Sequence, residues 1–193
     1  MILELLAAIL LPPSPVVLEN EHVRVTRNDA QCASHRTPGC GDRVVVALGT
    51  INLQAPGAIT HMRRGDILVF PAGKSFSQPS GDYLEVNIRP ERPPVKSPSV
   101  VIPPDKNSIL YDGDEFFVFE EKLDPGDTRA RHSHRERVVI VINKTRLQQW
   151  PDDGQMLFRD QIPDDVRFNP PVVHVVKTVG DQPLRNIVIE FKR

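Results

Sequence analysis

Three histidines in two short, strand-like stretches have the types and spacing of metal ligands. His132 and His134 are two residues apart, and His174 follows about forty residues later. Residues i and i+2 of a strand point to the same side of a sheet, roughly 6.5 to 7 Å apart along the backbone. Two such imidazoles and a third from a neighbouring strand supply the nitrogen ligands that zinc and similar ions accept, with a coordination position left open. The spacing therefore predicts a metal site, and the alternative is three histidines with ordinary structural roles.

Several arginines lie close to these histidines in the sequence: Arg129, Arg131, Arg135, Arg137 and Arg167. We predict that Arg129, Arg131 and Arg167 bind substrate, because a guanidinium that points into the site can hold a carboxylate through two hydrogen bonds. Three neutral imidazoles leave the charge of a metal ion uncompensated, which favours an anionic ligand or hydroxide. We therefore expect a small acidic molecule as the ligand. The alternative for each arginine is a solvent-facing position on a strand.

Composition limits the class of protein. The chain has 193 residues and a net charge of −1 with histidine neutral, so no basic surface indicates nucleic-acid binding. Nineteen prolines and eleven glycines separate runs of valine, isoleucine, phenylalanine and threonine. This pattern is typical of many short strands joined by tight turns. Neither a GxSxG elbow nor a P-loop is present.

The first forty residues leave two questions open. Residues 1–15 begin with an apolar run as long as a signal-peptide core, but they carry Glu4, lack a positive start and are too short to span a bilayer. They are either a secretory leader, which would place the protein in the periplasm or outside the cell, or an accessory strand or short helix of a protein that is otherwise cytoplasmic. Cys32 and Cys40 either form a small disulfide loop or are unlinked thiols.

The chain contains two copies of one pattern. Four segments of the first half recur in the same order: 18–25 as 111–118, 42–48 as 136–142, 65–71 as 164–170, and 83–90 as 184–191. The offset grows from 93 to 101 residues, which indicates a longer middle loop in the second copy. We predict one antiparallel barrel in residues 16–92, a proline-rich linker in 93–107 and a second barrel in 108–193.

These motifs resemble those of the cupin superfamily, G(X)5HXH(X)3–4E(X)6G and G(X)5PXG(X)2H(X)3N. Gly126, His132, His134 and His174 follow the pattern in the second copy, while the first copy keeps only the glycines and proline of the second motif. The resemblance covers nearly all of residues 16–193. It implies an all-β fold of two tandem double-stranded β-helix (jelly-roll) barrels, a bicupin, with one divalent transition metal such as Fe, Mn, Ni, Cu or Zn in the C-terminal barrel.

The chain departs from this pattern at the acidic ligand. The glutamate expected after His134 is replaced by Val138, or by Val139 with the longer spacing. Glu136 would share the face of His132 and His134 in a regular strand, so it is a candidate substitute. A bulge would turn its carboxylate away from the metal.

Two functions follow from the resemblance. One is a metal-dependent oxygenase, isomerase or lyase that acts on a small polar or acidic molecule. The other is a non-catalytic cupin that binds a small ligand or has a structural role, with the first copy free of metal in either case. Fold resemblance alone does not choose between them. No membrane span is expected, and both a homodimer and a monomer are compatible with the sequence.

Overall fold

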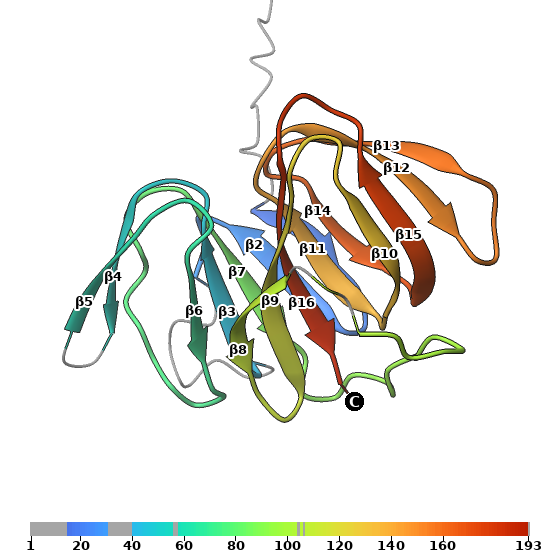
Figure 1. Cartoon of the computed structure of the whole chain (residues 1–193). Helices are drawn as coiled ribbons and strands as arrows, with labels where there is room; N and C mark the ends of the chain where they lie inside the picture. The colour runs from blue at the N-terminus through green and yellow to red at the C-terminus, as the bar shows by residue number, and fades with distance from the viewer. Residues whose placement is uncertain (1–14, 31–39, 56–57, 104, 106, 193) are drawn as a thin grey trace, which may run out of the picture.

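The protein consists of short antiparallel strands. A computed structural model describes residues 15–30, 40–55, 58–103, 105 and 107–192, and these contain sixteen strands and no helix (Figure 1). The predicted all-β class is confirmed. Two predictions lie outside the described residues. The possible leader covers residues 1–15, of which the structure describes only Pro15. The possible disulfide between Cys32 and Cys40 involves Cys32, which is not described.

The N-terminal half forms a five-stranded sheet and a hairpin. The sheet has the order β1 (Val16–Glu19), β2 (Val23–Arg27), β7 (Tyr83–Ile88), β3 (Arg43–Ala47), β6 (Ile67–Phe70). The hairpin pairs β4 (Ile51–Ala55) with β5 (Ala58–Met62). All of these pairings are antiparallel.

The C-terminal half forms two sheets that face each other as the walls of a barrel (Figure 1). One has the order β8 (Asn107–Asp112), β9 (Phe116–Leu123), β16 (Leu184–Phe191), β11 (Arg137–Val141), β14 (Val166–Asn169). The other has the order β10 (Thr128–His134), β15 (Val172–Thr178), β12 (Thr145–Pro151), β13 (Leu157–Gln161).

The five-stranded sheets of the two halves have the same strand order. Strands β1, β2, β7, β3 and β6 of the first half correspond in sequence to β8, β9, β16, β11 and β14 of the second. Each pair overlaps one of the repeated segments, so the sequence repeat corresponds to a repeat of strand topology. Each of the sheets takes its described strands from one half only.

The largest apolar cluster lies between the two halves. Valines 23, 25, 44 and 46 from the first sheet pack with Val118, Ile140, Ile187 and Ile189 from the second. Intervening residues such as Val45 and Val139 belong to separate clusters inside their own halves. Strands buried on both faces read as continuous apolar runs, which explains why residues 43–47 and 137–141 are buried throughout. This packing holds the C-terminal barrel against the N-terminal sheet.

Residues between Ile88 and Asn107 form no strand in the parts that the structure describes. Figure 1 shows this segment passing below the strands of the C-terminal half. The described residues contain no helix with the length and hydropathy needed to cross a membrane.

Candidate metal centre

His132, His134 and His174 lie together inside the C-terminal barrel. One nitrogen from each imidazole can be chosen so that all three atoms lie within 4.8 Å of one another. The ring centroids are 4.8 Å apart for His132 and His134, 4.6 Å for His132 and His174, and 5.5 Å for His134 and His174. All three side chains are buried. The structure therefore brings together the three histidines that the sequence singled out.

Strand pairing explains this convergence. His132 on β10 is directly opposite His174 on β15, and His134 follows on the same face of β10. Side chains directly opposite each other in an antiparallel pair are close neighbours. The β10 and β15 register shifts between Arg129 and His132. This irregularity turns both Arg129 and His132 inward, although they are three residues apart and would face opposite sides of a regular strand.

Two of the imidazoles are oriented through Nδ1. The Nδ1 atom of His132 is 2.8 Å from the carbonyl oxygen of Ala130. The Nδ1 atom of His134 is 2.8 Å from Oε2 of Glu190, on β16. An N–H that donates to either oxygen leaves Nε2 of the same ring as the atom with a free lone pair. Metal-binding histidines commonly donate their second N–H to a carbonyl or a carboxylate in this way.

The cluster has the chemical features of a cation site. Nε2 of His132 and Nε2 of His174 are buried and have no hydrogen-bond partner. Nitrogens bound to one tetrahedral ion at about 2.1 Å are ~3.4 Å apart, so two rings with nitrogens up to 4.8 Å apart would each move by less than ~1 Å to share an ion. These orphaned nitrogens therefore fit a bound metal.

Burial keeps the imidazoles neutral. It is the main cause of a lowered pKa at His132 and at His134, and it lowers the pKa of His174 to about 2. Repulsion from His132 and His134, whenever these rings are protonated, and from the cations Arg137 and Arg129 adds to the effect at His174. Metal binding requires the deprotonated ring, so all three side chains are in the binding form at neutral pH.

Glu136 lies away from the cluster, which corrects the expectation of a substitute ligand. Strand β10 ends at His134, and the chain turns before β11 begins at Arg137. Oε2 of Glu136 accepts a hydrogen bond from the Lys96 backbone N–H and lies 3.6 Å from Nε2 of His22. The turn therefore directs this carboxylate toward the N-terminal half, not into the barrel.

The three arginines predicted to bind substrate occupy different places. Arg129 is buried and bonds to Oε1 of Glu121 at 2.8 Å, so its guanidinium is already paired. Arg131 is exposed and pairs with Asp152. Arg167 does line the cavity next to the histidines, with its Nε 2.6 Å from Oδ2 of Asp165. Of these three arginines, only Arg167 lines the cavity.

Two other arginines lie at the cavity without a carboxylate partner among the described residues. Arg137 donates to the carbonyl oxygens of Arg135 and Pro170, and Arg159 has no ion pair. Burial lowers the pKa of Arg137 to about 10, and burial followed by the nearby charge of Arg167 lowers the pKa of Arg159. Both remain cations at neutral pH. Glu190 and Glu121 lie close enough to attract Arg137, whereas no carboxylate of the described residues forms an ion pair with Arg159, so Arg159 offers a positive charge to an anionic ligand.

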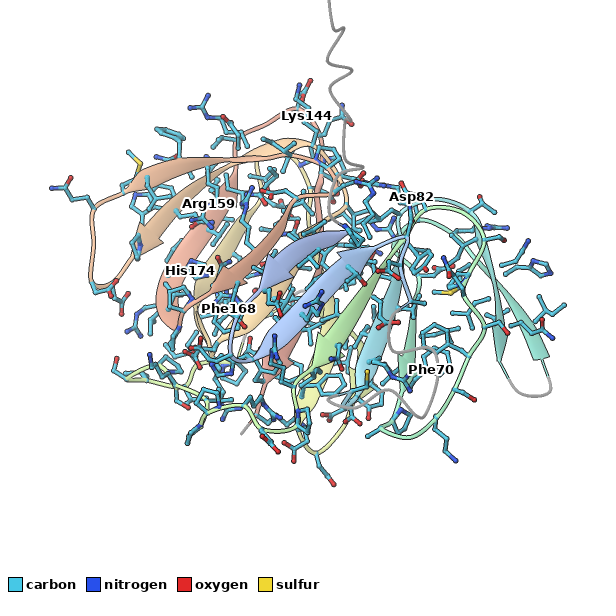
Figure 2. The ribbon with its side chains drawn as sticks, turned by 180° about the vertical axis from the view of Figure 1, so that it is seen from behind. Phe70, Asp82, Lys144, Arg159, Phe168 and His174 are labelled. Atoms are coloured by element: carbon cyan, nitrogen blue, oxygen red, sulfur yellow. The ribbon has the colours of Figure 1, made fainter. Side chains whose placement is uncertain are left out.

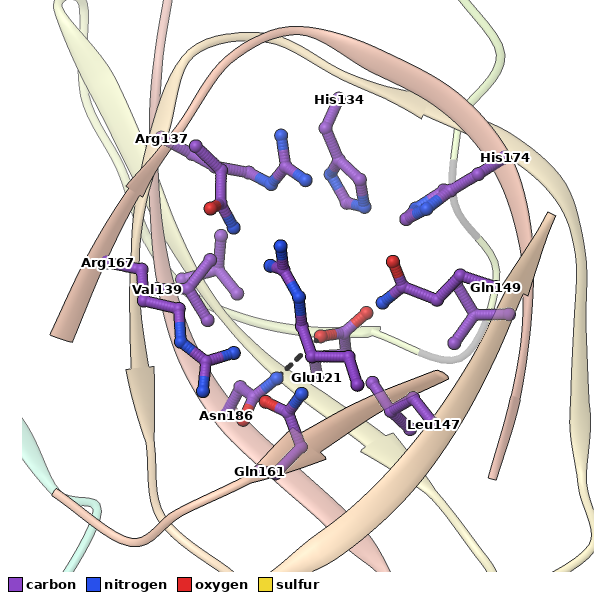
Figure 3. A pocket seen from close by; sticks show the side chains of 14 residues that line it. Glu121, His134, Arg137, Val139, Leu147, Gln149, Gln161, Arg167, His174 and Asn186 are labelled. Atoms are coloured by element: carbon purple, nitrogen blue, oxygen red, sulfur yellow. Dashed lines mark hydrogen bonds between the residues drawn. The ribbon is translucent and has the colours of Figure 1, made fainter. Parts of the chain in front are cut away.

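The cavity is small and opens into a larger one. The inner part, shown in Figure 3, has a volume of about 40 Å³. That is room for ~3 water-sized groups. An outer part of about 240 Å³ shares five residues with it: Arg137, Gln149, Arg159, Asn169 and His174. Figure 2 places Arg159 and His174 in the same half of the molecule.

Two glutamates that sequence reasoning missed lie at the site. Glu121 is the only carboxylate among the described residues that line the inner cavity, and Oε2 of Glu121 accepts a hydrogen bond from Asn186 at 3.0 Å (Figure 3). Burial raises the pKa of Glu121, but the Arg129 guanidinium and the hydrogen bond from Asn186 outweigh burial and lower it overall. Glu190 is the second of these glutamates, and its Oε2 lies 2.8 Å from Nδ1 of His134. The signal in the sequence was a glutamate shortly after an apolar run, since residues 116–119 precede Glu121 and residues 187–189 precede Glu190.

Solved structures with a similar architecture include a protein described as a cupin barrel. AerE from Microcystis aeruginosa is 16% identical with a TM-score of 0.55, and the match covers 94% of this chain and 98% of that one. A Cupin 2 conserved barrel domain protein from Leptotrichia buccalis is 12% identical with a TM-score of 0.55, over 93% and 88%. This chain has the cupin fold. No protein-family model and no curated protein matches this chain by sequence.

Replacing Glu190 with glutamine is expected to weaken metal binding to the cupin barrel by about 10- to 100-fold. The amide removes the charge that holds the Nδ1–H of His134, while its size and its hydrogen bond from the Arg135 backbone are kept. Competition with a chromogenic chelator measures the affinity. Glu91→Gln, at an exposed glutamate, is the matched control. Equal affinities for the two variants would contradict the orienting role of Glu190.

Proposed function

We propose that this cupin protein binds one divalent transition-metal ion through His132, His134 and His174, and a small acidic molecule beside it. The observation that carries the proposal is the pair of buried, partnerless Nε2 atoms on His132 and His174 within a neutral three-histidine cluster. A divalent ion held there would act as a Lewis acid toward a bound oxygen atom or lower the pKa of bound water.

The chain's own residues define how an acidic molecule would bind. Arg137 and Arg159 are cations that a carboxylate can neutralise, and both line the inner and the outer cavity. Gln149 and Asn169 add hydrogen-bonding groups along the same path. Glu121 also lines the inner cavity, where its carboxylate is paired with Arg129. An oxygenase, isomerase or lyase reaction on a small acid fits this arrangement.

A second candidate is a non-catalytic protein that binds the acid without transforming it. Val139, at one of the two positions where the cupin motif has its acidic ligand, presents an apolar side chain to the cavity. A metal held by three neutral ligands and an anion is also a stable arrangement without turnover.

Metal content tests the proposal directly. Protein purified without a histidine tag is incubated separately with Fe(II), Mn(II), Ni(II), Cu(II) and Zn(II), desalted, and measured by inductively coupled plasma mass spectrometry. We expect about one ion per chain for at least one metal. Protein that stays free of metal under all five conditions would overturn the proposal. Screening the loaded protein against small carboxylic acids for consumption of the acid then separates the enzyme from the binding protein.

Arg159→Gln is expected to weaken carboxylate binding. With malonate as the probe, we expect the dissociation constant of the metal-loaded protein to rise by about tenfold, because a charge-assisted hydrogen bond becomes a neutral one. Isothermal titration calorimetry measures the change. Arg131→Gln is the control, since Arg131 lies outside the cavity and pairs with Asp152. An equal loss of malonate affinity in both variants, or an unchanged affinity in Arg159→Gln, would contradict an anion site at this position.

A further inference from the structure

A second pocket lies next to Glu190 and shares no lining residue with the metal cavity. Its volume is about 380 Å³. One wall comes from residues 98–103 of the segment between the halves, and the others come from β8, β9, β10 and β16. Glu190 separates the two sites, since its carboxylate binds His134 of the cluster and also lines this pocket.

Most of the pocket wall is apolar. Six of its ten lining residues are Pro98, Val101, Ile102, Pro103, Ile109 and Phe117. Val101 is 65% exposed and Ile109 is 59% exposed, so this apolar surface faces solvent in the chain alone. Covering such surface with an apolar ligand is favourable because it removes the surface from water. A volume of this size lies within the range of small-molecule sites.

Some polar groups of the pocket have hydrogen-bond partners within the protein, and others have none among the described residues. Ser133 Oγ exchanges hydrogen bonds with the backbone of Ile102, and both Glu190 oxygens accept hydrogen bonds. In contrast, Nδ2 and Oδ1 of Asn107 are both buried and have no partner. The Arg135 guanidinium has no carboxylate partner among the described residues, although its backbone N–H bonds to Glu190. A buried amide without partners is rare in folded proteins and indicates a missing group.

We propose that this pocket binds a small monocarboxylic acid with an apolar chain or ring. The carboxylate would accept hydrogen bonds from the Arg135 guanidinium and the Asn107 amide, for which the described part of the chain supplies no acceptor. The apolar body would lie against Val101, Ile109 and Phe117. The site is distinct from the metal centre and does not depend on whether the histidines hold an ion.

Octanoate is the probe, and isothermal titration calorimetry with the full chain is the measurement. Acetate carries the charge without the chain, and 1-octanol carries the chain without the charge. Arg135→Gln removes the cation, and Ile109→Glu places a repelling carboxylate at an exposed position of an edge strand. Arg159→Gln changes the metal cavity alone, and circular dichroism checks that each variant is folded.

We expect octanoate to bind the wild type, with acetate and 1-octanol at least about tenfold weaker. Arg135→Gln and Ile109→Glu should each weaken octanoate binding by about tenfold or more, while Arg159→Gln should leave it unchanged. The proposal is overturned by a wild type that does not bind octanoate, or by Arg135→Gln binding it as tightly as the wild type. A loss confined to Arg159→Gln would place the acid in the metal cavity and would also overturn it.

Discussion

Alanine at both His132 and His134 is expected to reduce bound metal from about one ion per chain to an undetectable amount. The double variant leaves His174 as the only imidazole of the cluster, and a single imidazole does not retain an ion through desalting. Metal at ~100 times its dissociation constant stabilises a folded protein by about 2.7 kcal/mol. For a chain of this length we therefore expect a chelator to lower the melting temperature of the wild type by about 5 to 10 °C.

The same experiment needs two comparisons. His61→Ala removes an exposed histidine on β5 and should keep both the metal and the response to chelator. His174→Gln removes the third ligand with a side chain of similar size, so it separates loss of a ligand from loss of packing. Normal metal content in the double variant and in His174→Gln would show that the ion binds elsewhere.

Phe191→Ala is expected to lower the free energy of unfolding by about 3 to 5 kcal/mol. Phe191 has no exposed surface and lies in the cluster between the two halves. Its ring centroid is 5.9 Å from that of His22 in the first half and 6.2 Å from that of Phe168 in the second. Truncation therefore leaves a cavity where the halves meet. Urea denaturation followed by circular dichroism measures the change.

Phe158→Ala is the matched control for the same chemical change. Phe158 is 51% exposed on β13 and contacts the Arg146 guanidinium, so its loss should cost less than about 1 kcal/mol. Equal costs for the two phenylalanines would contradict the packing of the halves through Phe191. A separate unfolding transition for each half of the wild type would contradict it as well.

The sequence alone determined the class of fold and the three histidines. Alternating and continuous apolar runs between glycines and prolines predicted short strands, and the repeated segments correspond to strands in the same order in both sheets. The HxH spacing placed His132 and His134 on one face because side chains alternate along any strand. These are local properties, so neighbouring residues are enough to predict them.

Only the tertiary structure decided which charged residues surround the histidines. Glu190 is 56 residues from His134 in the chain, yet strand packing brings its carboxylate to Nδ1. Glu136 is two residues away, and the turn after β10 removes it from the barrel. The bulge in β10 likewise reverses the side that Arg129 faces. A one-residue irregularity exchanges the two faces of a strand, and contacts between distant strands depend on their register, so neither follows from spacing in the sequence.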